Sequence, residues 1–215
     1  MHLNLKATTI VLIIIAAILI YKYAVPYFWH FQLHQTTKKS YENITESKVP
    51  WKVYGTSEQG RNIYYWQTED SSETTLIFGA FHGDEQTGFH LVKQLADTML
   101  AHPELITKGA VFVPVLNPDG LMARTRVNAN GVDLNRNFPT EDWTPIYKKK
   151  VNHPCHEPCS EKETRLAMQM IEDFKPVKII SIHDALEMNN YNGPALELAQ
   201  LLEKYNGYPP MADVG

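Results

Sequence analysis

A histidine and a glutamate lie three positions apart in FGAFHGDEQTG, the stretch from Phe78 to Gly88 that begins within an apolar run. His82 and Glu85 offer one imidazole nitrogen and one carboxylate oxygen, which are both ligands that zinc accepts. A catalytic zinc site needs three protein ligands and an open position, so the pair alone is weak evidence for a metal and fits a polar turn between a strand and a helix. The question is therefore whether the chain supplies a third ligand.

The third ligand is expected at His183, at the end of a second apolar run, VKIISIHD. This run and TTLIFGAF, residues 74–81, are both predicted to be buried strands of one sheet. Sheets of this kind bind ligands beyond the carboxyl ends of their strands, where both histidines fall. We therefore expect His82, Glu85 and His183 to bind one Zn²⁺ per chain. The alternative is that His183 is a strand-end histidine that bonds only to the backbone.

Four arginine and asparagine side chains suited to hydrolysis follow in RTRVNANGVDLNRNFP, residues 124–139. Arg124, Arg126, Asn135 and Arg136 lie in a long predicted loop, and such loops are usually functional or disordered. A guanidinium group can neutralise an oxyanion or bind a carboxylate through two hydrogen bonds. The other interpretation is a surface loop whose arginines are solvated.

The elements that must position these residues alternate between strands and helices. WKVYG and NIYYWQ are predicted to form a hairpin, and AVFVPVL is predicted to be a further strand. Helical periodicity runs from Leu91 to Leu100, and Ser160 with Glu163 is typical of a capping box that begins another helix. A last helix is predicted between residues 193 and 207. Its inward face is expected to consist of Leu198, Ala199, Leu201, Leu202 and Tyr205. This alternation predicts an α/β sheet with helices on both faces.

The N-terminus predicts a membrane segment. Residues 7–21 are apolar and free of charge, although shorter than the ~20 residues that span a bilayer comfortably. Aromatic residues then cluster up to Trp29, as they do at a membrane interface. We expect a single-pass anchor over residues 1–29, a tether over 30–49 and one exported domain over 50–215. A cleaved signal peptide and a buried core helix are the alternatives.

Two further features limit the possible partners. The net charge of -4 argues against a nucleic-acid partner, which would require a basic surface. Cys155 and Cys159 lie close enough in sequence to form a small disulfide in an exported domain. Free thiols, or a structural zinc with His153 and His156, are the other possibilities, although the spacing does not match the usual paired pattern.

Several of these stretches together resemble a known family. HGDE, NPDG, RVNANGVDLNRNFP, SEKET and SIH occur in the order and approximate spacing of the zinc metallocarboxypeptidases of the carboxypeptidase A type. The compact loop is similar to the bacterial murein peptide amidase branch, which cuts the γ-D-glutamyl–diaminopimelate bond of cell-wall peptides. The resemblance covers the chain from about Pro50 onward. It implies a mixed, mostly parallel β-sheet flanked by helices.

The resemblance also implies roles for the residues that match. His82, Glu85 and His183 correspond to the zinc ligands, and a zinc-activated water would attack the substrate carbonyl. Arg126 corresponds to the arginine that stabilises the oxyanion. The residues that bind the terminal carboxylate of the substrate correspond to Asn135 and Arg136, while Arg124 is a further substrate contact. The implied partner is a peptide, with a murein peptide as the leading expectation.

One departure from the family concerns the general base. The family places that glutamate on a later strand, whereas this sequence ends at Gly215, so a fragment or a truncated copy is expected. Two other functions remain open. Aspartoacylase and succinylglutamate desuccinylase amidohydrolases share a His-Gly-x-Glu pair and an Asp-Leu-Asn-Arg stretch. A non-catalytic module that binds zinc and peptide without turnover is the third possibility.

Overall fold

The protein is described by a computed structural model over residues 5–68, 73–184 and 186–212. Its main sheet has five strands in the order β1-β2-β4-β3-β5. The strands are β1 Lys52–Thr56, β2 Asn62–Gln67, β3 Thr74–Phe78, β4 Gly109–Val113 and β5 Lys178–Ser181. The predicted hairpin is present as the antiparallel pair β1 and β2.

The sheet is mixed, as expected, but the prediction that it is mostly parallel is inexact. Strand β3 pairs in parallel with β4 on one side and with β5 on the other. Strand β2 pairs with β1 and with β4 in antiparallel fashion. Parallel and antiparallel pairings are therefore equally frequent in the described part of this sheet, and the parallel half is the part that follows helical crossovers.

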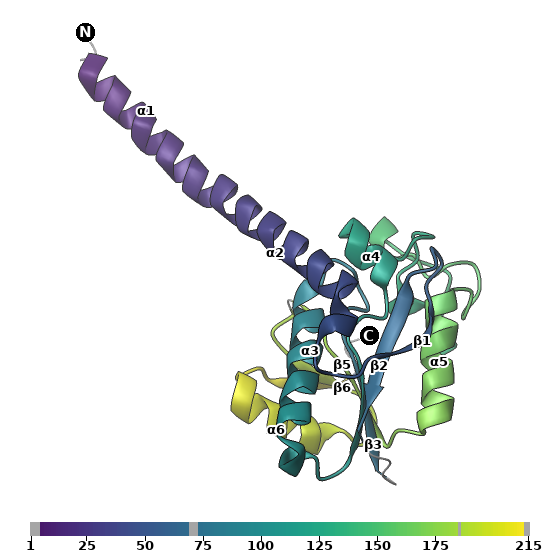
Figure 1. Cartoon of the computed structure of the whole chain (residues 1–215). Helices are drawn as coiled ribbons and strands as arrows, with labels where there is room; N and C mark the ends of the chain where they lie inside the picture. Colours follow the sequence, from purple (N-terminus) through teal and green to yellow (C-terminus); the bar gives the residue numbers. More distant parts are fainter. Residues whose placement is uncertain (1–4, 69–72, 185, 213–215) are drawn as a thin grey trace.

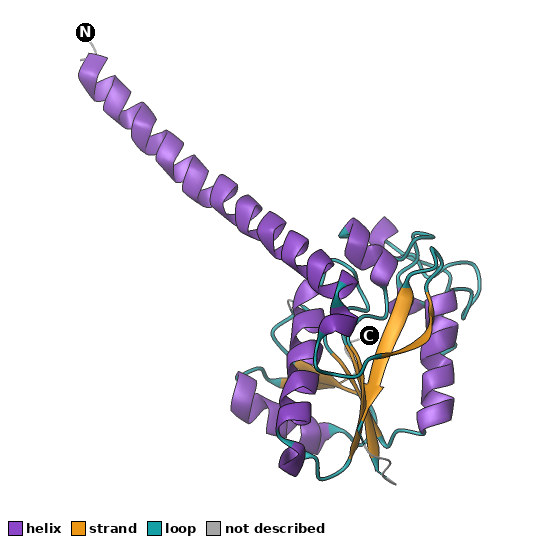
Figure 2. Cartoon of the chain, viewed as in Figure 1, coloured by secondary structure: helices purple, strands orange, loops and turns teal. Residues whose placement is uncertain are grey.

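Helices cover both faces of the sheet (Figures 1 and 2). On one face, Ile77 and Phe112 pack in a core that includes residues of α3, Gln86–Ala101. On the other face, Leu76 and Phe78 pack in a core that includes residues of α5, Lys162–Phe174. Successive side chains of a strand point to opposite faces, so a continuous apolar run fills both cores. The predicted doubly buried strand at β3 is confirmed.

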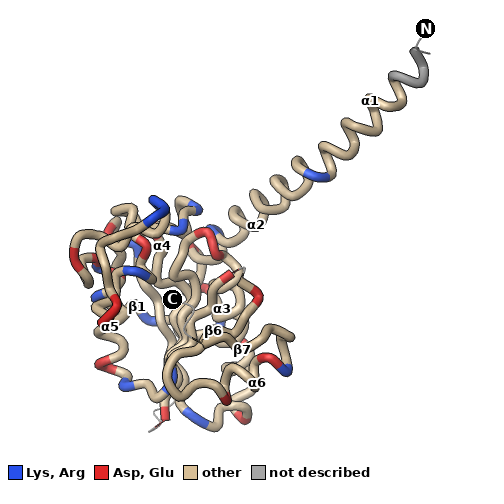
Figure 3. Tube along the Cα trace, turned by 180° about the vertical axis from the view of Figure 1, so that it is seen from behind, with Lys and Arg blue, Asp and Glu red and all other residues tan. Residues whose placement is uncertain are grey.

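The N-terminal segment forms one long helix that projects from the domain (Figure 1). It consists of α1 Leu5–Leu19, one π-helical turn over Ile20–Ala24, and α2 Val25–Glu42. The stretch Thr9–Glu42 is long and apolar enough to cross a membrane, a test that a signal sequence also passes. Figure 3 shows that the projecting part is nearly free of charged residues. Residues 1–4 of the expected anchor lie outside the described part of the chain.

The expected tether over residues 30–49 is wrong in its structure. Most of this segment is helical, and a short 3-10 helix, Ile44–Glu46, follows α2. Tyr41, Ile44 and Val49 are buried in the core on the α3 side of the sheet. The Tyr41 hydroxyl donates to the Asn62 carbonyl at 2.7 Å. These few apolar residues are enough to attach the segment to the domain. The mixed, mostly polar composition of the segment gives no sign of this packing.

Short helices interrupt the long loop that was expected after the predicted strand AVFVPVL. They are α4 Pro118–Ala123, η4 Leu134–Arg136 and η5 Lys150–Asn152. A further short helix, η3 Pro103–Leu105, lies outside this loop, between α3 and β4. The NPDG stretch begins α4, with Asn117 at its N-cap. Its Asn117 side chain accepts a hydrogen bond from the Gly120 N–H at 2.8 Å, as an N-cap does.

The predicted capping box at Ser160 and Glu163 is wrong. Helix α5 begins at Lys162, and no side chain caps its first turn. The Glu163 side chain is buried and accepts hydrogen bonds from the Glu58 N–H at 3.1 Å and the Asn128 amide at 3.1 Å. Glu163 therefore bonds to residues distant in the sequence, in place of the predicted capping of its own helix.

The last segment forms β6 Asn189–Tyr191, α6 Leu196–Asn206 and β7 Pro210–Ala212. Helix α6 ends at Gly207, as predicted, because this residue adopts a left-handed conformation with φ 74°. The expectation that its apolar face points inward is wrong, because Leu201 is 48% and Tyr205 85% exposed. The prediction that VKIISIHD forms a buried strand is wrong in its burial, because β5 is largely exposed and Ile179 is 48% exposed. Among the described residues β5 is an edge strand that pairs only with β3.

The two cysteines are free thiols in this structure, which is one of the three alternatives for them. The Cys159 thiol donates to the Met168 sulfur at 3.0 Å. Burial raises the pKa of the Cys159 thiol and so favours its protonated form.

Candidate metal centre

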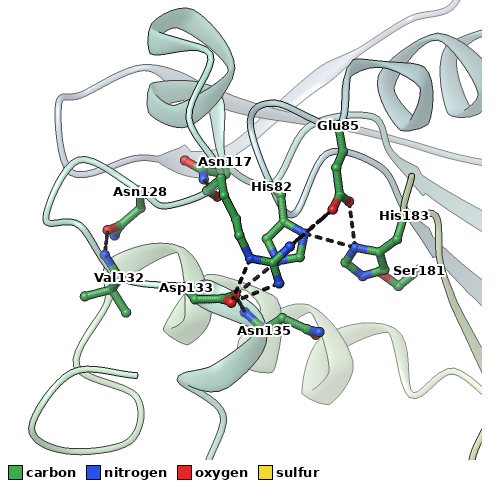
Figure 4. Close-up of polar contacts among 10 residues, drawn as sticks. His82, Glu85, Asn117, Asn128, Val132, Asp133, Asn135, Ser181 and His183 are labelled. Atoms are coloured by element: carbon green, nitrogen blue, oxygen red, sulfur yellow. Dashed lines mark hydrogen bonds and ion pairs between the residues drawn. The ribbon is translucent and has the colours of Figure 1, made fainter. Parts of the chain in front are cut away.

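His82, Glu85 and His183 meet at one point, although His183 is about a hundred positions away from the other two (Figure 4). Glu85 Oε1 lies 2.7 Å from His82 Nδ1, and Glu85 Oε2 lies 2.8 Å from His183 Nδ1. The two Nδ1 atoms are 3.2 Å apart. The structure thus brings together the three residues that the sequence nominates as ligands.

The parallel pairing of β3 and β5 explains this convergence. Phe78, the last residue of β3, is in register with Ser181, the last residue of β5. The Ile182 N–H then donates to the Phe78 carbonyl at 2.9 Å, which keeps the two chains side by side after the strands end. Neighbouring parallel strands end at the same edge of a sheet, so His82 and His183 leave it together.

A close backbone approach fixes the turn that carries His82 and Glu85. Gly83 lies against the backbone of α4, and a Cβ atom at this position would be 1.8 Å from the carbonyl carbon of Gly120. Only glycine fits at such a distance. The Glu85 N–H donates to the His82 carbonyl at 3.2 Å within the same turn. The glycine of the HGDE stretch therefore positions both ligands.

The electrostatic environment favours an ionised glutamate between the two imidazoles. Burial alone would raise the pKa of Glu85, but hydrogen bonds from His183 and His82 outweigh it and lower this pKa to about 2. Burial would lower the pKa of His82, but its contacts with Asp133 and Glu85 outweigh burial and raise it. The centre holds a carboxylate with a full negative charge at neutral pH.

Asp133 is a further member of this centre that the sequence reasoning missed. Its side chain is fully buried, and its Oδ1 accepts a hydrogen bond from His82 Nε2 at 3.0 Å. Its Oδ2 accepts from Arg126 Nε at 3.0 Å and lies 2.9 Å from Arg126 Nη2. The position of Asp133 two residues before Asn135, within VDLNRN, was the available signal. A histidine that binds a metal through one ring nitrogen commonly donates a hydrogen bond from its other ring N–H to such a carboxylate.

Arg126 reaches the ligands themselves. Its Nη1 lies 3.2 Å from His82 Nδ1 and 3.4 Å from Glu85 Oε1. The Asp133 carboxylate holds the other side of the same guanidinium group, so its orientation is fixed by two contacts. The structure therefore places Arg126 beside the three candidate ligands, and its chemical role stays a prediction.

Two buried asparagines hold the loop that carries Arg126 and Asp133. Asn128 Oδ1 accepts from the Val132 N–H at 3.0 Å, and the Asn128 N–H donates to the Val132 carbonyl at 2.9 Å. The Asn128 amide also donates to Glu161 Oε2 at 2.7 Å, which ties the loop to the start of α5. Asn117 Nδ2 donates to the Arg126 carbonyl at 3.4 Å. These contacts make the loop a fixed part of the centre.

Of the other predicted substrate contacts, Asn135 and Arg136 adjoin the centre and Arg124 does not. Asn135 and Arg136 belong to η4, directly after Asp133, and the Asn135 N–H donates to Asp133 Oδ1 at 3.0 Å. Arg124 is exposed at the C-cap of α4, and its charge acts on His34 of α2. No contact joins Arg124 to the three ligands within the described residues, so the structure does not bring it into this centre.

The donor set fits a zinc ion. One ligand atom from each of His82, Glu85 and His183 lies within 4.8 Å of the others, so that one cation can reach all three. Two imidazole nitrogens and one carboxylate oxygen are a known catalytic zinc set. The His183 side chain is 29% exposed, whereas that of His82 is only 2% exposed. The partly open side would admit water and a substrate.

Comparison with known proteins defines the family to which the chain belongs. The zinc carboxypeptidase family matches residues 32–195 of this chain. The chain belongs to the zinc carboxypeptidase family, and this membership implies a zinc centre and hydrolytic chemistry. The match begins within α2, which agrees with the observation that this helix packs into the domain.

The chain is similar to murein peptide amidase A of Escherichia coli K12, with 33% identity over 151 residues. This match covers 61% of the chain and 60% of that relative, so the chain spans well under two thirds of its length. Murein peptide amidase A of Vibrio campbellii is 31% identical, with 75% of this chain and 68% of that protein covered. The human carboxypeptidase N catalytic chain is 26% identical, with 81% of this chain and 46% of that protein covered.

Solved structures agree in fold. The murein-tripeptide amidase of Escherichia coli O157 superposes with a TM-score of 0.63 at 27% identity, covering 77% of this chain and 73% of that one. Bovine thrombin-activatable fibrinolysis inhibitor superposes with a TM-score of 0.62 at 16% identity, covering 87% and 74%. The predicted zinc carboxypeptidase fold is confirmed.

Proposed function

We propose that this protein is a zinc-dependent peptidase that hydrolyses an amide bond next to a terminal carboxylate, with murein peptides as its substrates. One observation carries the proposal. Two imidazoles and an ionised carboxylate, from two separate segments, converge beyond the ends of β3 and β5. The convergence lies at the edge of the sheet where α/β folds place their active sites.

His82, Glu85 and His183 would hold the zinc. When bound there, zinc supplies a Lewis acid and lowers the pKa of a water molecule from 15.7 towards about 7. Asp133 accepts a hydrogen bond from the Nε2–H of His82, which would leave the Nδ1 lone pair of this imidazole for coordination. The buried carboxylate therefore selects the tautomer that a ligand needs.

Arg126 would stabilise the oxyanion that forms on the substrate carbonyl. Its guanidinium lies beside two of the ligand atoms and is oriented by Asp133 before any substrate arrives. A donor that is already oriented stabilises developing negative charge without reorganisation at the moment of reaction. This is the physical reason to assign Arg126 to catalysis.

Asn135 and Arg136 would bind the terminal carboxylate of the substrate. Both lie on the short η4 helix, and the backbone of Asn135 is bonded to the carboxylate that holds His82. An amide and a guanidinium group are suited to a carboxylate, since each donates more than one N–H. Anchoring the substrate here would fix the distance between its carboxylate and the amide bond to be cut.

The substrate class rests on the relatives. Two of them are named murein peptide amidases, and their substrates are peptides of the cell wall. We further propose that the N-terminal helix is a single-pass membrane anchor and that the domain is extracytoplasmic, where murein is found. The helix Thr9–Glu42 has the length and composition required. Protease added to intact spheroplasts should then digest the domain, whereas a cytoplasmic domain would be protected.

The test is hydrolysis of the tripeptide L-alanyl-γ-D-glutamyl-diaminopimelate by the zinc-loaded full-length protein in detergent micelles. Release of diaminopimelate is expected, with loss of activity in a chelator and recovery on addition of zinc. His82→Ala should abolish release. His102→Ala is the matched control, because the His102 side chain is 58% exposed and its imidazole pairs with the exposed Glu104.

Other outcomes would support other functions. Hydrolysis of N-acyl amino acids but not of murein peptides would favour the aspartoacylase-type amidohydrolase. Binding of zinc and tripeptide with no turnover would favour a binding module. Activity that persists in His82→Ala would refute the zinc mechanism.

A further inference from the structure

An exposed loop of apolar and basic residues lies between η4 and α5. Every residue in the stretch 144–151 is exposed. Ile146 is 81% exposed, Tyr147 45% and Val151 49%, and the lysines at 148–150 stand between them. Single exposed apolar residues are common on protein surfaces, but a contiguous group of them marks an interaction site. The proposed reaction uses none of these side chains.

The loop has a defined shape and is attached to the domain. The Tyr147 ring packs edge-to-face on the His153 ring, with centroids 4.7 Å apart. The Asn152 N–H donates to the Lys149 carbonyl at 2.9 Å, and the His153 carbonyl accepts from the Asp133 N–H at 2.8 Å. The loop is therefore held from behind, while the tip at Ile146 stays uncovered by the described residues.

The loop lies at the end of the domain from which the N-terminal helix projects. The His34 ring of α2 hydrogen-bonds to the backbone of Met122 in α4, so α2 and α4 are in contact. In Figures 1 and 3, α4 and the loop that follows η4 lie at this end, whereas α6 lies at the opposite end of the domain. A bilayer that holds the helix would therefore face the loop.

The helix leaves little space between that bilayer and the domain. The aromatic residues expected at the membrane interface end at Trp29, which is 68% exposed, and the first buried residue of α2 is Thr37. Eight residues at 1.5 Å each separate the two by only about 12 Å along an unbroken helix. A loop at this end of the domain can therefore reach the lipid headgroups.

The charge and the apolar side chains of the loop match an anionic bilayer surface. The stretch from residue 143 to 156 contains the lysines at 148–150 and no acidic residue. A lysine close to an anionic leaflet strengthens binding by roughly fivefold, so three of them strengthen it by on the order of a hundredfold. Exposed apolar side chains beside lysines insert into the boundary between headgroups and acyl chains, where tyrosine is also favoured.

We propose that the loop 144–151 docks on anionic phospholipid headgroups, with Ile146 inserted in the bilayer and the lysines on the phosphates. The proposal rests on the proposed membrane anchor, which brings the loop to the surface. A murein fragment is the rival occupant, because the loop also borders Asn135 and Arg136. The lipid is favoured because Ile146 is 81% exposed, whereas a residue that lines a substrate site would be shielded.

The test measures the depth of a nitroxide label on the full-length protein in lipid nanodiscs. The label is carried by Ile146→Cys in a Cys155→Ser/Cys159→Ser background. Tyr205→Cys in the same background is the matched control, because Tyr205 is 85% exposed on α6 at the far end of the domain. Trp29→Cys reports whether the helix is inserted. Collisions of the label with oxygen, which concentrates in lipid, are compared with collisions with a water-soluble nickel chelate.

The expected result depends on the charge of the lipid. In nanodiscs that contain phosphatidylglycerol, the label at position 146 should collide mainly with oxygen and the label at position 205 mainly with nickel. In pure phosphatidylcholine, the ratio of lipid-buried to water-exposed label at position 146 should fall by about a hundredfold. The triple variant Lys148→Ser/Lys149→Ser/Lys150→Ser should show the same decrease in the anionic nanodiscs.

The outcomes separate the loop from the anchor. A label at position 146 that stays in water on the anionic bilayer, with the label at position 29 in lipid, refutes the docking loop and leaves the anchor. The reverse pattern refutes the anchor and supports the loop, and two labels in water refute both. If soluble murein fragments immobilise the label at position 146 and the bilayer does not, the loop belongs to the substrate site and the proposal is overturned.

Discussion

Replacing Asp133 with asparagine should weaken both the fold and the metal centre. The fully buried carboxylate accepts hydrogen bonds from His82, from Arg126 and from the Asn135 N–H. Asparagine keeps the size of the side chain but replaces one acceptor oxygen with an NH₂ group. That group must face either the imidazole N–H or the guanidinium group, and both of these are donors.

The magnitude follows from the contacts that are lost. Arg126 contacts Asp133 through Nε at 3.0 Å and Nη2 at 2.9 Å, and breaking a buried charge pair costs about 3–5 kcal/mol. The Arg126 side chain is 26% exposed, so water recovers part of this, and we expect a loss of about 3 kcal/mol. For a chain of this length, 1 kcal/mol moves the melting temperature by about 2–4 °C, which predicts a decrease of about 6–12 °C.

Zinc affinity should decrease together with stability. Removing the carboxylate that orients a ligating histidine typically weakens metal binding by about 10–100-fold. The assay is competition for zinc with a chromophoric chelator, alongside thermal unfolding of the same sample. Asp97→Asn is the matched control, since the Asp97 side chain is 40% exposed and forms a surface pair with Lys93 at 2.8 Å. The reasoning is refuted if Asp133→Asn binds zinc and unfolds like the Asp97→Asn control.

Three further predictions follow from single contacts. Gly83→Ala should cost at least about 3 kcal/mol of unfolding free energy in denaturant titration, because its Cβ would overlap the Gly120 backbone; a stable variant would contradict this. Tyr54→Phe should cost about 1 kcal/mol at neutral pH, because the phenol donates to Asp173 at 2.6 Å. Burial and this bond raise the pKa of Tyr54, so its contribution is present below pH 10.0 and is lost as the pH rises above that value. Alkaline unfolding should therefore be less steep in the Phe variant, and equal slopes would exclude the effect. Arg126→Lys should lower kcat on the tripeptide by about 10²–10³-fold with a smaller change in KM, and an unchanged kcat would remove Arg126 from catalysis.

The convergence of the three candidate ligands could be predicted because parallel strands of one sheet end at the same edge. His82 and His183 each end an apolar run, and parallel strands in one sheet bring their carboxyl ends to the same edge. Asp133 could not be assigned in the same way. Its contact with His82 depends on how the loop folds back, and that is set by tertiary bonds of Asn128 and Asn117.

Burial was harder to predict than secondary structure. The periodicity of α6 identifies an apolar face but does not say whether another element covers it, and Leu201 and Tyr205 are exposed. The opposite error occurred in the supposed tether, where Tyr41 and Ile44 are buried among polar neighbours.

Metal stoichiometry tests the central claim most directly. The wild-type chain, purified with zinc and dialysed, should retain about one zinc per chain by elemental analysis. His82→Ala/His183→Ala should retain almost none, whereas Cys155→Ser/Cys159→Ser should retain the wild-type amount. The opposite pattern, with zinc lost with the thiols and kept without the imidazoles, would contradict the assignment of the catalytic centre.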